Sequence, residues 1–173
     1  GERVAIMLPN TPQTISADWG VLKAGGTVVF TNPLYMETEI VHQFRDSGAR
    51  FLITLDLLWP KIEALRSQLN IEKYFVTSIA DGLRFPLNLL YKLRSWREGQ
   101  SGRVAFDTTR VMPWSTLTSG ISTYTAKGLI PEKDLALLQY TGGTTGLAKG
   151  CMITHANLCA NVMQCTAMLP GMG

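Results

Sequence analysis

Residues 4–30 have the sequence VAIMLPNTPQTISADWGVLKAGGTVVF, and this stretch decides the fold. The apolar run at residues 4–8 ends in a proline–asparagine turn, which is typical of a buried strand. From Pro12, a favourable first-turn residue, apolar side chains repeat with helical spacing until Gly25 and Gly26 end the pattern. These apolar side chains are Ile15, Trp19 and Leu22. Residues 27–30 predict a second buried strand, so the stretch is a strand–helix–strand unit.

The alternation of strands and helices continues beyond this unit. An amphipathic helix is predicted to end near Gly48, and a second helical pattern covers residues 57–69. Short apolar runs at residues 51–54 and 74–77 predict two more buried strands. Because alternating strands and helices form right-handed crossovers onto one sheet, the sequence predicts an α/β fold, a largely parallel sheet with layered helices.

Residues 78–133 have a different character, because glycine, proline and polar residues interrupt every period. This region predicts connecting structure with short helices. Residues 87–96 form an amphipathic pattern with basic side chains at Lys92, Arg94 and Arg97. Such a helix either lies on a membrane surface or exposes a solvated face, and the solvated face is the simpler interpretation.

The composition indicates a globular chain. Of the 173 residues, 46% are apolar, which is enough to bury one sizeable core. The 16 basic and 13 acidic side chains leave a net charge of +3 without a block of basic residues, so the charge pattern of a nucleic-acid binder is missing. No apolar run reaches the roughly 20 residues that a membrane-spanning helix needs.

Cysteine usage favours a reducing, cytoplasmic location. The three cysteines crowd near one end without a Cys-x-x-Cys pair, which argues against a disulfide framework. The first residues do not resemble a signal peptide. The chain opens without Met before a strand-like run and stops after a helix-like segment, so we expect a piece truncated at both ends.

The segment that carries chemistry is TGGTTGLAKG at residues 141–150, between apolar strands at residues 135–140 and 151–153. Its closely spaced glycines allow positive φ and let backbone N–H groups face inward, which forms a nest for an anion. Threonine hydroxyls add donors, and Lys149 adds a mobile cation. These features suit a nucleoside triphosphate better than an ordinary turn. The candidate phosphate-binding residues are Thr141, Gly142, Gly143, Thr144, Thr145, Gly146 and Lys149.

Two better-known phosphate-binding motifs do not fit this loop. A Walker loop needs Gly-Lys followed by Ser or Thr, but the order here is Lys149, Gly150, Cys151. A dinucleotide fingerprint needs Gly-x-Gly and an acidic residue about 20 positions later, and both are missing.

Residues 140–150, with the Thr-His-x-Asn-Leu motif at residues 154–158, resemble the signature loop of adenylate-forming (AMP-binding) enzymes. Residues 1–10 and 22–35 are similar to the strand–helix–strand opening of the same enzymes. The resemblance therefore covers most of the chain. It implies the fold of a partial N-terminal domain of an adenylate-forming enzyme.

Within that superfamily, the Gly142-Gly143 pair and residues 45–49 and 85–91 look most like bacterial long-chain fatty acid:CoA ligases, the acyl-CoA synthetases. Ala148 stands where many relatives have proline, which removes some stiffness from the loop but no donor. Met36 stands where a helix-capping Ser or Thr is common. Neither departure removes a phosphate-binding group.

The resemblance implies a two-step ligation by the parent protein. ATP activates a fatty acid to an acyl-adenylate, and coenzyme A then displaces the AMP. The loop would hold the β and γ phosphates of ATP through backbone N–H groups and the charge of Lys149. Thr144 and Thr145 would contact the phosphates or Mg²⁺, with Thr145 as the metal ligand. The implied partners are ATP, a fatty acid and coenzyme A, and the implied cofactor is Mg²⁺.

The resemblance also implies that residues 1–173 are an incomplete N-terminal domain without the C-terminal lid. The metal-binding glutamate, the ribose-binding aspartate, the hinge and the catalytic lysine would all lie beyond Gly173. We therefore expect no catalytic residue within the chain, and we expect the chain alone to be inactive. Acyl chain length, a homodimer and a peripheral membrane contact stay open.

Cys151, His155 and Cys159 are four residues apart, with Cys165 nearby, and they raise the alternative of a zinc site. The favoured interpretation places Cys151 on a strand, Thr154 at the helix N-cap, and Cys159 and Cys165 in the core. The methionines near the end of the chain are likewise interpreted as core filling, and not as a pliable binding surface. They are Met152, Met163, Met168 and Met172.

His42 lies on the predicted second helix, where a hydrogen-bonded or surface histidine is the simpler interpretation than a catalytic one. Three rival functions remain for the whole chain. They are activation of another acid, such as aryl-CoA formation or amino-acid adenylation, a nucleotide-binding module without ligase activity, and a purely structural fragment.

Overall fold

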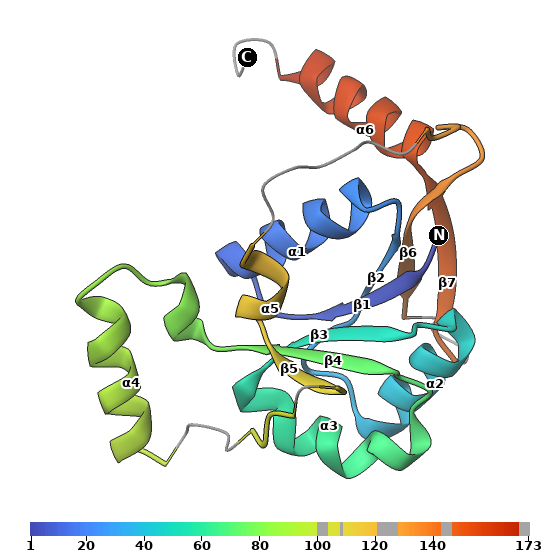
Figure 1. The fold of residues 1–173 in the computed structure, drawn as a ribbon. Coiled ribbons are helices and arrows are strands. Elements are labelled where there is room, and N and C mark those ends of the chain that lie inside the picture. The colour runs from blue at the N-terminus through green and yellow to red at the C-terminus, as the bar shows by residue number, and fades with distance from the viewer. Residues whose placement is uncertain (100–103, 108, 121–127, 143–146, 170–173) are drawn as a thin grey trace.

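The computed structural model describes residues 1–99, 104–107, 109–120, 128–142 and 147–169. A twisted sheet forms its centre (Figure 1). The strands are β1 (Arg3–Met7), β2 (Thr27–Phe30), β3 (Phe51–Leu55), β4 (Lys73–Thr77), β5 (Val111–Pro113), β6 (Leu135–Thr141) and β7 (Lys149–Thr154). They lie in the order β5-β4-β3-β1-β2-β6-β7. β1 to β6 are parallel, and β7 is antiparallel to β6, which confirms the predicted α/β class.

The helices cover both faces of the sheet. They are α1 (Pro12–Lys23), α2 (Glu37–Ser47), α3 (Trp59–Leu65), α4 (Leu87–Arg97), α5 (Ser115–Thr118) and α6 (His155–Met168), with 3-10 turns η1 (Asp56–Leu58), η2 (Arg66–Gln68) and η3 (Ile79–Gly82). Figure 1 shows α1 and α6 on one side, and α2 and α3 on the other. The change of side follows from right-handed crossovers, because β1 to β2 and β2 to β3 run in opposite directions across the sheet.

Both faces of the central strands are buried, which explains their continuous apolar sequences. In β1, Ala5 and Met7 pack into the core under α2 and α3, whereas Ile6 packs into the core under α1. β2 alternates in the same way, with Val29 on the first side and Val28 on the second. A strand with this pattern has no solvent face, so only a sheet with a helix layer on each side satisfies it.

The helix α1 forms where the sequence predicts it, and Leu22 packs against the core, but the other two predicted apolar side chains do not face the sheet. Ala17 and Val21 are buried in the core, while Ile15 and Trp19 are 64% and 60% exposed. The small side chains let the helix axis approach the strands closely, and the crossover path then sets which side faces inward. The helical spacing identified the helix correctly and its buried face incorrectly.

The helix α2 ends as predicted, at Gly48, which has φ of 63°. This left-handed conformation favours glycine, because a side chain there would be strained. At the other end, the carboxylate of Glu39 accepts a hydrogen bond of 2.6 Å from the backbone N–H of Met36. That bond satisfies a donor near the helix start although Met36 has no capping oxygen.

A short strand, β5, lies within the region predicted as connections. β5 pairs with β4, and the residues on either side of β5 extend the pairing. The N–H of Tyr74 donates to the carbonyl of Arg110 at 2.7 Å, and the N–H of Trp114 donates to the carbonyl of Val76 at 2.9 Å. Backbone N–H groups, foremost that of Arg110, donate to the Asp107 carboxylate and hold its pKa well below the usual range. Three residues are too short to give a period, so the sequence could not predict this strand.

The helix α6 begins as predicted, with Thr154 as N-cap accepting from the N–H of Asn157 at 3.2 Å. The prediction that Cys159 and Cys165 lie in the core is wrong, because both are exposed. The core assignment also fails for Met152, Met163 and Met168, which are all exposed, while Met172 lies outside the described residues. For the residues on α6, the reason is that this helix packs only through its first turns, where Leu158 joins the core under α1, whereas Met152 lies on β7, the last strand of the sheet.

Two further properties of the described part of the chain bear on function. Within it, no three His, Cys, Asp or Glu side chains are grouped so that they could hold a metal ion, so the four zinc candidates do not converge. Among its helices, none is long and apolar enough to cross a membrane.

Candidate phosphate-binding site

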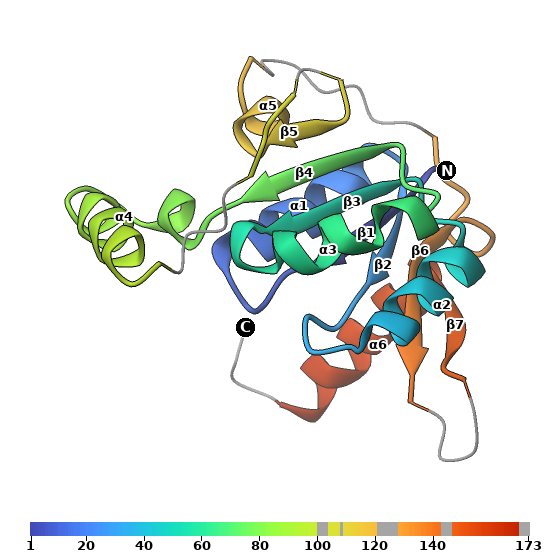
Figure 2. The same ribbon diagram turned by 90° about the horizontal axis from the view of Figure 1, so that it is seen from below.

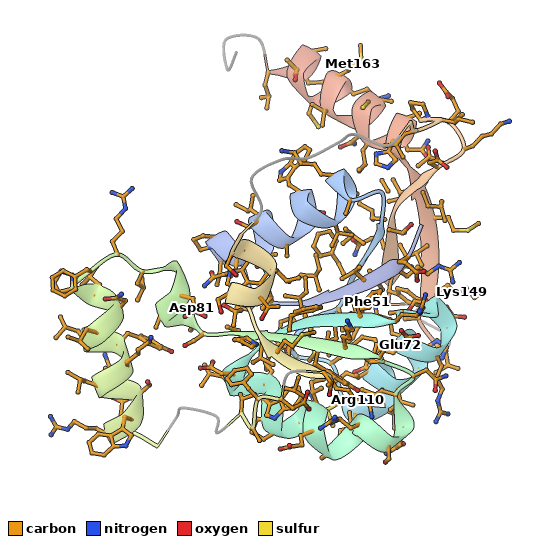
Figure 3. All side chains as sticks on the ribbon, in the orientation of Figure 1. Phe51, Glu72, Asp81, Arg110, Lys149 and Met163 are labelled. Atoms are coloured by element: carbon orange, nitrogen blue, oxygen red, sulfur yellow. The ribbon has the colours of Figure 1, made fainter. Side chains whose placement is uncertain are left out.

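The loop of interest connects β6 to β7, and these two strands form an antiparallel hairpin. Thr141, the last residue of β6, pairs directly with Lys149, the first residue of β7. Since β6 belongs to the parallel set, its end lies at the carboxyl edge of the sheet, where ligands of α/β proteins bind. Figure 2 shows β6 and β7 side by side, and Figure 3 shows Lys149 at the start of β7 beside α2.

Three of the seven candidate residues are described, and all three are exposed. Thr141 and Lys149 face each other across the hairpin, so a hydroxyl and an ammonium group flank the loop. A Cβ placed on Gly142 would meet no atom within 4 Å, which leaves its backbone open to close approach by a ligand. The other candidates, Gly143, Thr144, Thr145 and Gly146, lie outside the described residues.

Tyr140 anchors the β6 side of the loop. Its side chain is 6% exposed, and its hydroxyl donates a hydrogen bond of 2.5 Å to Oδ2 of Asp46 on α2. Burial, and then the bond to the Asp46 carboxylate, raise the pKa of the Tyr140 phenol. Gly150 on β7 lies opposite Tyr140. A Cβ at this position would lie 3.0 Å from Cζ of Tyr140, which is closer than an ordinary van der Waals contact. This glycine therefore serves the packing of the tyrosine.

His42 anchors the β7 side of the loop. Its Nε2 lies 3.0 Å from the carbonyl oxygen of Ala148, and since a carbonyl only accepts, Nε2 is the donor. The half-buried Ala148 packs against the core under α2 and α3. The histidine is hydrogen-bonded, in agreement with the favoured interpretation of the sequence. Both ends of the loop are thus tied to one helix, α2.

A cavity of about 640 Å³ opens beside the hairpin. Its walls are side chains of α2, Leu65 of α3 and Leu147 of the loop, with His42 and Asp46 among the α2 residues. The cavity therefore lies next to the loop, on the side of Leu147.

The sequence missed Tyr140 and Asp46 as supports of the loop. Asp46 lies 94 residues from Tyr140, and His42 lies 106 residues from Ala148. No periodicity or spacing predicts such pairs, because they arise only when α2 and the hairpin come together in the fold. The single local signal is the position of Tyr140, a hydrogen-bonding aromatic residue in an otherwise apolar strand.

We expect Tyr140→Phe to lower the free energy of unfolding by about 1–2 kcal/mol at neutral pH, because a bond to a charged acceptor is lost. The raised pKa of Tyr140 means that its contribution is fully present below the ordinary tyrosine pKa, about 10, and is lost as the pH rises further. The difference between the variant and the wild type should therefore shrink in alkali. Thermal unfolding of the full-length protein across this pH range measures it.

A double-mutant cycle with Asp46→Asn separates the pair from other effects of either change. A coupling energy near zero would show that the two side chains do not support each other. A difference that stays constant into alkali would contradict the assignment of the titration to Tyr140.

Comparisons with known proteins agree with this geometry. The family model of the AMP-binding enzyme matches residues 1–171. The long-chain-fatty-acid–CoA ligase of Bacillus subtilis (strain 168) is 44% identical over 172 residues, which is 98% of this chain and 30% of the relative. The protein of the same name from Escherichia coli O157:H7 is 36% identical over 178 residues, covering 96% of this chain and 30% of the relative.

Solved structures give the same result for the fold. A long-chain-fatty-acid-CoA ligase from Archaeoglobus fulgidus superposes with a TM-score of 0.71 and 28% identity, covering 96% of this chain and 27% of that chain. The acetoacetyl-CoA synthetase from Streptomyces lividans superposes with a TM-score of 0.73 at 20% identity, covering 96% of this chain and 24% of that chain, and supports the fold alone.

The chain spans about 30% of the length of the curated relatives. The family match nevertheless covers nearly all of its residues, and the parallel sheet, the hairpin and the Gly/Thr/Lys loop all lie within that match. The chain therefore belongs to the AMP-binding enzyme family.

Proposed function

We propose that the full-length protein is a ligase that activates a fatty acid with ATP and transfers the acyl group to coenzyme A. Within it, residues 1–173 form part of the AMP-binding domain and supply the loop that binds the β and γ phosphates of ATP. The observation that carries the proposal is the hairpin itself. The described strand ends that border the Gly/Thr/Lys sequence, Thr141 and Lys149, lie at the carboxyl edge of the sheet, and the chain is 44% identical to a long-chain-fatty-acid–CoA ligase.

The first step joins a carboxylate oxygen to the α-phosphorus of ATP and breaks the bond to the β-phosphate, so pyrophosphate leaves. The attacking carboxylate is already ionised at neutral pH, so this step needs no general base. It does need an electrostatic cradle for the leaving group, which carries increasing negative charge in the transition state. In the second step the thiol of coenzyme A displaces AMP from the acyl-adenylate and forms a thioester.

The residues of the loop fit the first step. The Lys149 ammonium group and the Thr141 hydroxyl, paired across the hairpin, supply a cation and a donor to phosphate oxygens. The open backbone at Gly142 permits close approach of the phosphates. Because α2 is bonded to Tyr140 and Ala148, which stand just before Thr141 and just before Lys149, the backbone on both sides of the loop is held in place before the substrate binds, which lowers the cost of ordering it.

Mg²⁺ would neutralise phosphate charge and orient the leaving group. The side chains that fit this role are the hydroxyls of Thr144 and Thr145, with Thr145 as the proposed ligand, because hydroxyl and phosphate oxygens are the hard ligands that Mg²⁺ prefers. The remaining metal ligands and the binding sites for acid and coenzyme A are proposed to come from other parts of the full-length protein.

Carboxylate-dependent ATP–pyrophosphate exchange by the full-length protein tests the proposal. The acids to compare are acetate, octanoate, palmitate, an aryl acid and a mixture of amino acids. We expect palmitate to drive exchange best, and we expect palmitoyl-CoA to form when coenzyme A is added.

Each other outcome has a definite meaning. Exchange driven best by an aryl acid or an amino acid would keep the adenylation chemistry and overturn the fatty acid substrate. ATP binding without exchange by any acid would overturn the ligase in favour of a nucleotide-binding module. The absence of any effect of ATP on thermal stability would overturn nucleotide binding as well.

A further inference from the structure

The helix α4 projects away from the sheet in both ribbon views (Figures 1 and 2). Ser95 is its one buried residue, and Asn88 and Tyr91 are half-buried. These three positions follow helical spacing, so they lie on one face. Burial raises the pKa of the Tyr91 phenol, which agrees with its inward position.

The outward side of α4 is apolar. Leu89, Leu93 and Trp96 follow the spacing i, i+4, i+7 and share the face opposite Ser95, and Trp96 is 74% exposed. Other large apolar side chains that are exposed on or just before the helix are Phe85, Leu87 and Leu90. An ordinary surface helix has the reverse arrangement, with its apolar stripe against the core. The basic side chains Lys92, Arg94 and Arg97 are exposed, as the solvated face expected from the sequence requires, but large apolar side chains are exposed beside them.

Basic side chains border this apolar side. From Arg84 to Gly99 the sequence contains four basic residues and one acidic residue. The acidic residue, Glu98, is paired with Arg94 at 2.7 Å. On a helical projection, Lys92 and Arg97 lie at the two borders of the leucine and tryptophan face, where long side chains can bury their stems and keep their charges in water.

We propose that α4 is an interfacial anchor, which lies on a bilayer surface that contains anionic lipids. An apolar face of leucines and a tryptophan, flanked by basic residues, has the composition of helices that bind in the headgroup region. The excess of basic residues matches the negative potential of such a surface. At 11 residues the helix is about 16 Å long, shorter than the hydrocarbon core, so it lies on the membrane and does not span it.

The alternative occupant of this face is protein, either another segment of the full-length chain or a partner. A protein partner would have to place acidic groups opposite the basic border of this helix. Lipid phosphates supply that charge along the whole helix. The role of the anchor rests on the proposed function, because a fatty acid ligase at the bilayer surface would meet its substrate where fatty acids partition into the membrane.

Flotation of the full-length protein with lipid vesicles tests the anchor and requires no turnover, so its result is independent of the ligase assay. The vesicles contain phosphatidylcholine alone or phosphatidylcholine with phosphatidylglycerol, at low and high salt. We expect binding to the anionic vesicles, weakened by salt, and little binding to phosphatidylcholine alone.

Two variants separate the contributions to binding. Leu93→Ser with Trp96→Ser should weaken partition by about tenfold or more, because the main apolar side chains are lost. The matched control, Leu93→Ile with Trp96→Phe, keeps the apolar face and should bind as the wild type does. Lys92→Gln with Arg97→Gln should weaken binding to anionic vesicles by about fivefold per charge.

Failure of the wild type to float with anionic vesicles would overturn the anchor. So would unchanged flotation of the serine variant. Two results together would show that protein covers this face. The serine variant would lose much of its thermal stability, and the control and charge variants would float no more with vesicles than without them. In that case α4 is an internal contact and the membrane proposal is wrong.

Discussion

Lys149→Ala is expected to lower the kcat of ATP–pyrophosphate exchange by about 100- to 1,000-fold in the full-length protein, the loss typical of removing one group that stabilises transition-state charge. Lys149 is exposed and lies opposite Thr141 at the start of β7. Charge on the leaving pyrophosphate grows during the reaction, so the loss should fall on kcat more than on the KM for ATP.

Lys73→Ala is the matched control, because Lys73 is also exposed and begins a strand, β4, but at the opposite edge of the sheet. It should leave exchange unchanged. Lys149→Arg should recover part of the activity, since it keeps the charge but not the compact geometry of the ammonium group. Exchange by Lys149→Ala within a few-fold of the wild type would refute the role of this residue.

Trp59→Ala should produce the largest loss of stability. Trp59 is fully buried at the start of α3, and its ring meets that of Tyr74 edge to face with centroids 5.5 Å apart. Removing a buried tryptophan costs about 3–5 kcal/mol, because apolar burial is lost and a cavity remains. For a domain of this size the midpoint of thermal unfolding should fall by roughly 10 °C.

Trp96→Ala provides the comparison for Trp59, since the same atoms are removed from an exposed position on α4. Its effect on the midpoint should be small. A Trp59→Ala protein that unfolds within a degree or two of the wild type would contradict the packing of α3 against the sheet. Scanning calorimetry of both full-length variants makes the measurement.

The strands, the helices and the character of the loop could be predicted because each depends on neighbouring residues. Continuous apolar runs predicted β1 to β4, and glycines correctly marked the ends of α1 and α2. The sequence also predicted apolar strands on both sides of the loop, and the structure shows that they pair antiparallel as β6 and β7. The failures came where local signals were weak, as in the three residues of β5, or where a helix had more than one apolar side, as in α1.

The sequence by itself determined the α/β class, and it is the source of the proposal that residues 141–149 bind phosphate with Lys149 as the cation. Only the tertiary structure decided that α2 holds the loop, through His42 to Ala148 on one strand and Asp46 to Tyr140 on the other. It also decided that α4 turns its serine inward and its leucines outward. The physical reason is the same for both. Backbone conformation follows from local side-chain preferences, whereas the partner and the buried side of each element depend on residues that are distant in sequence.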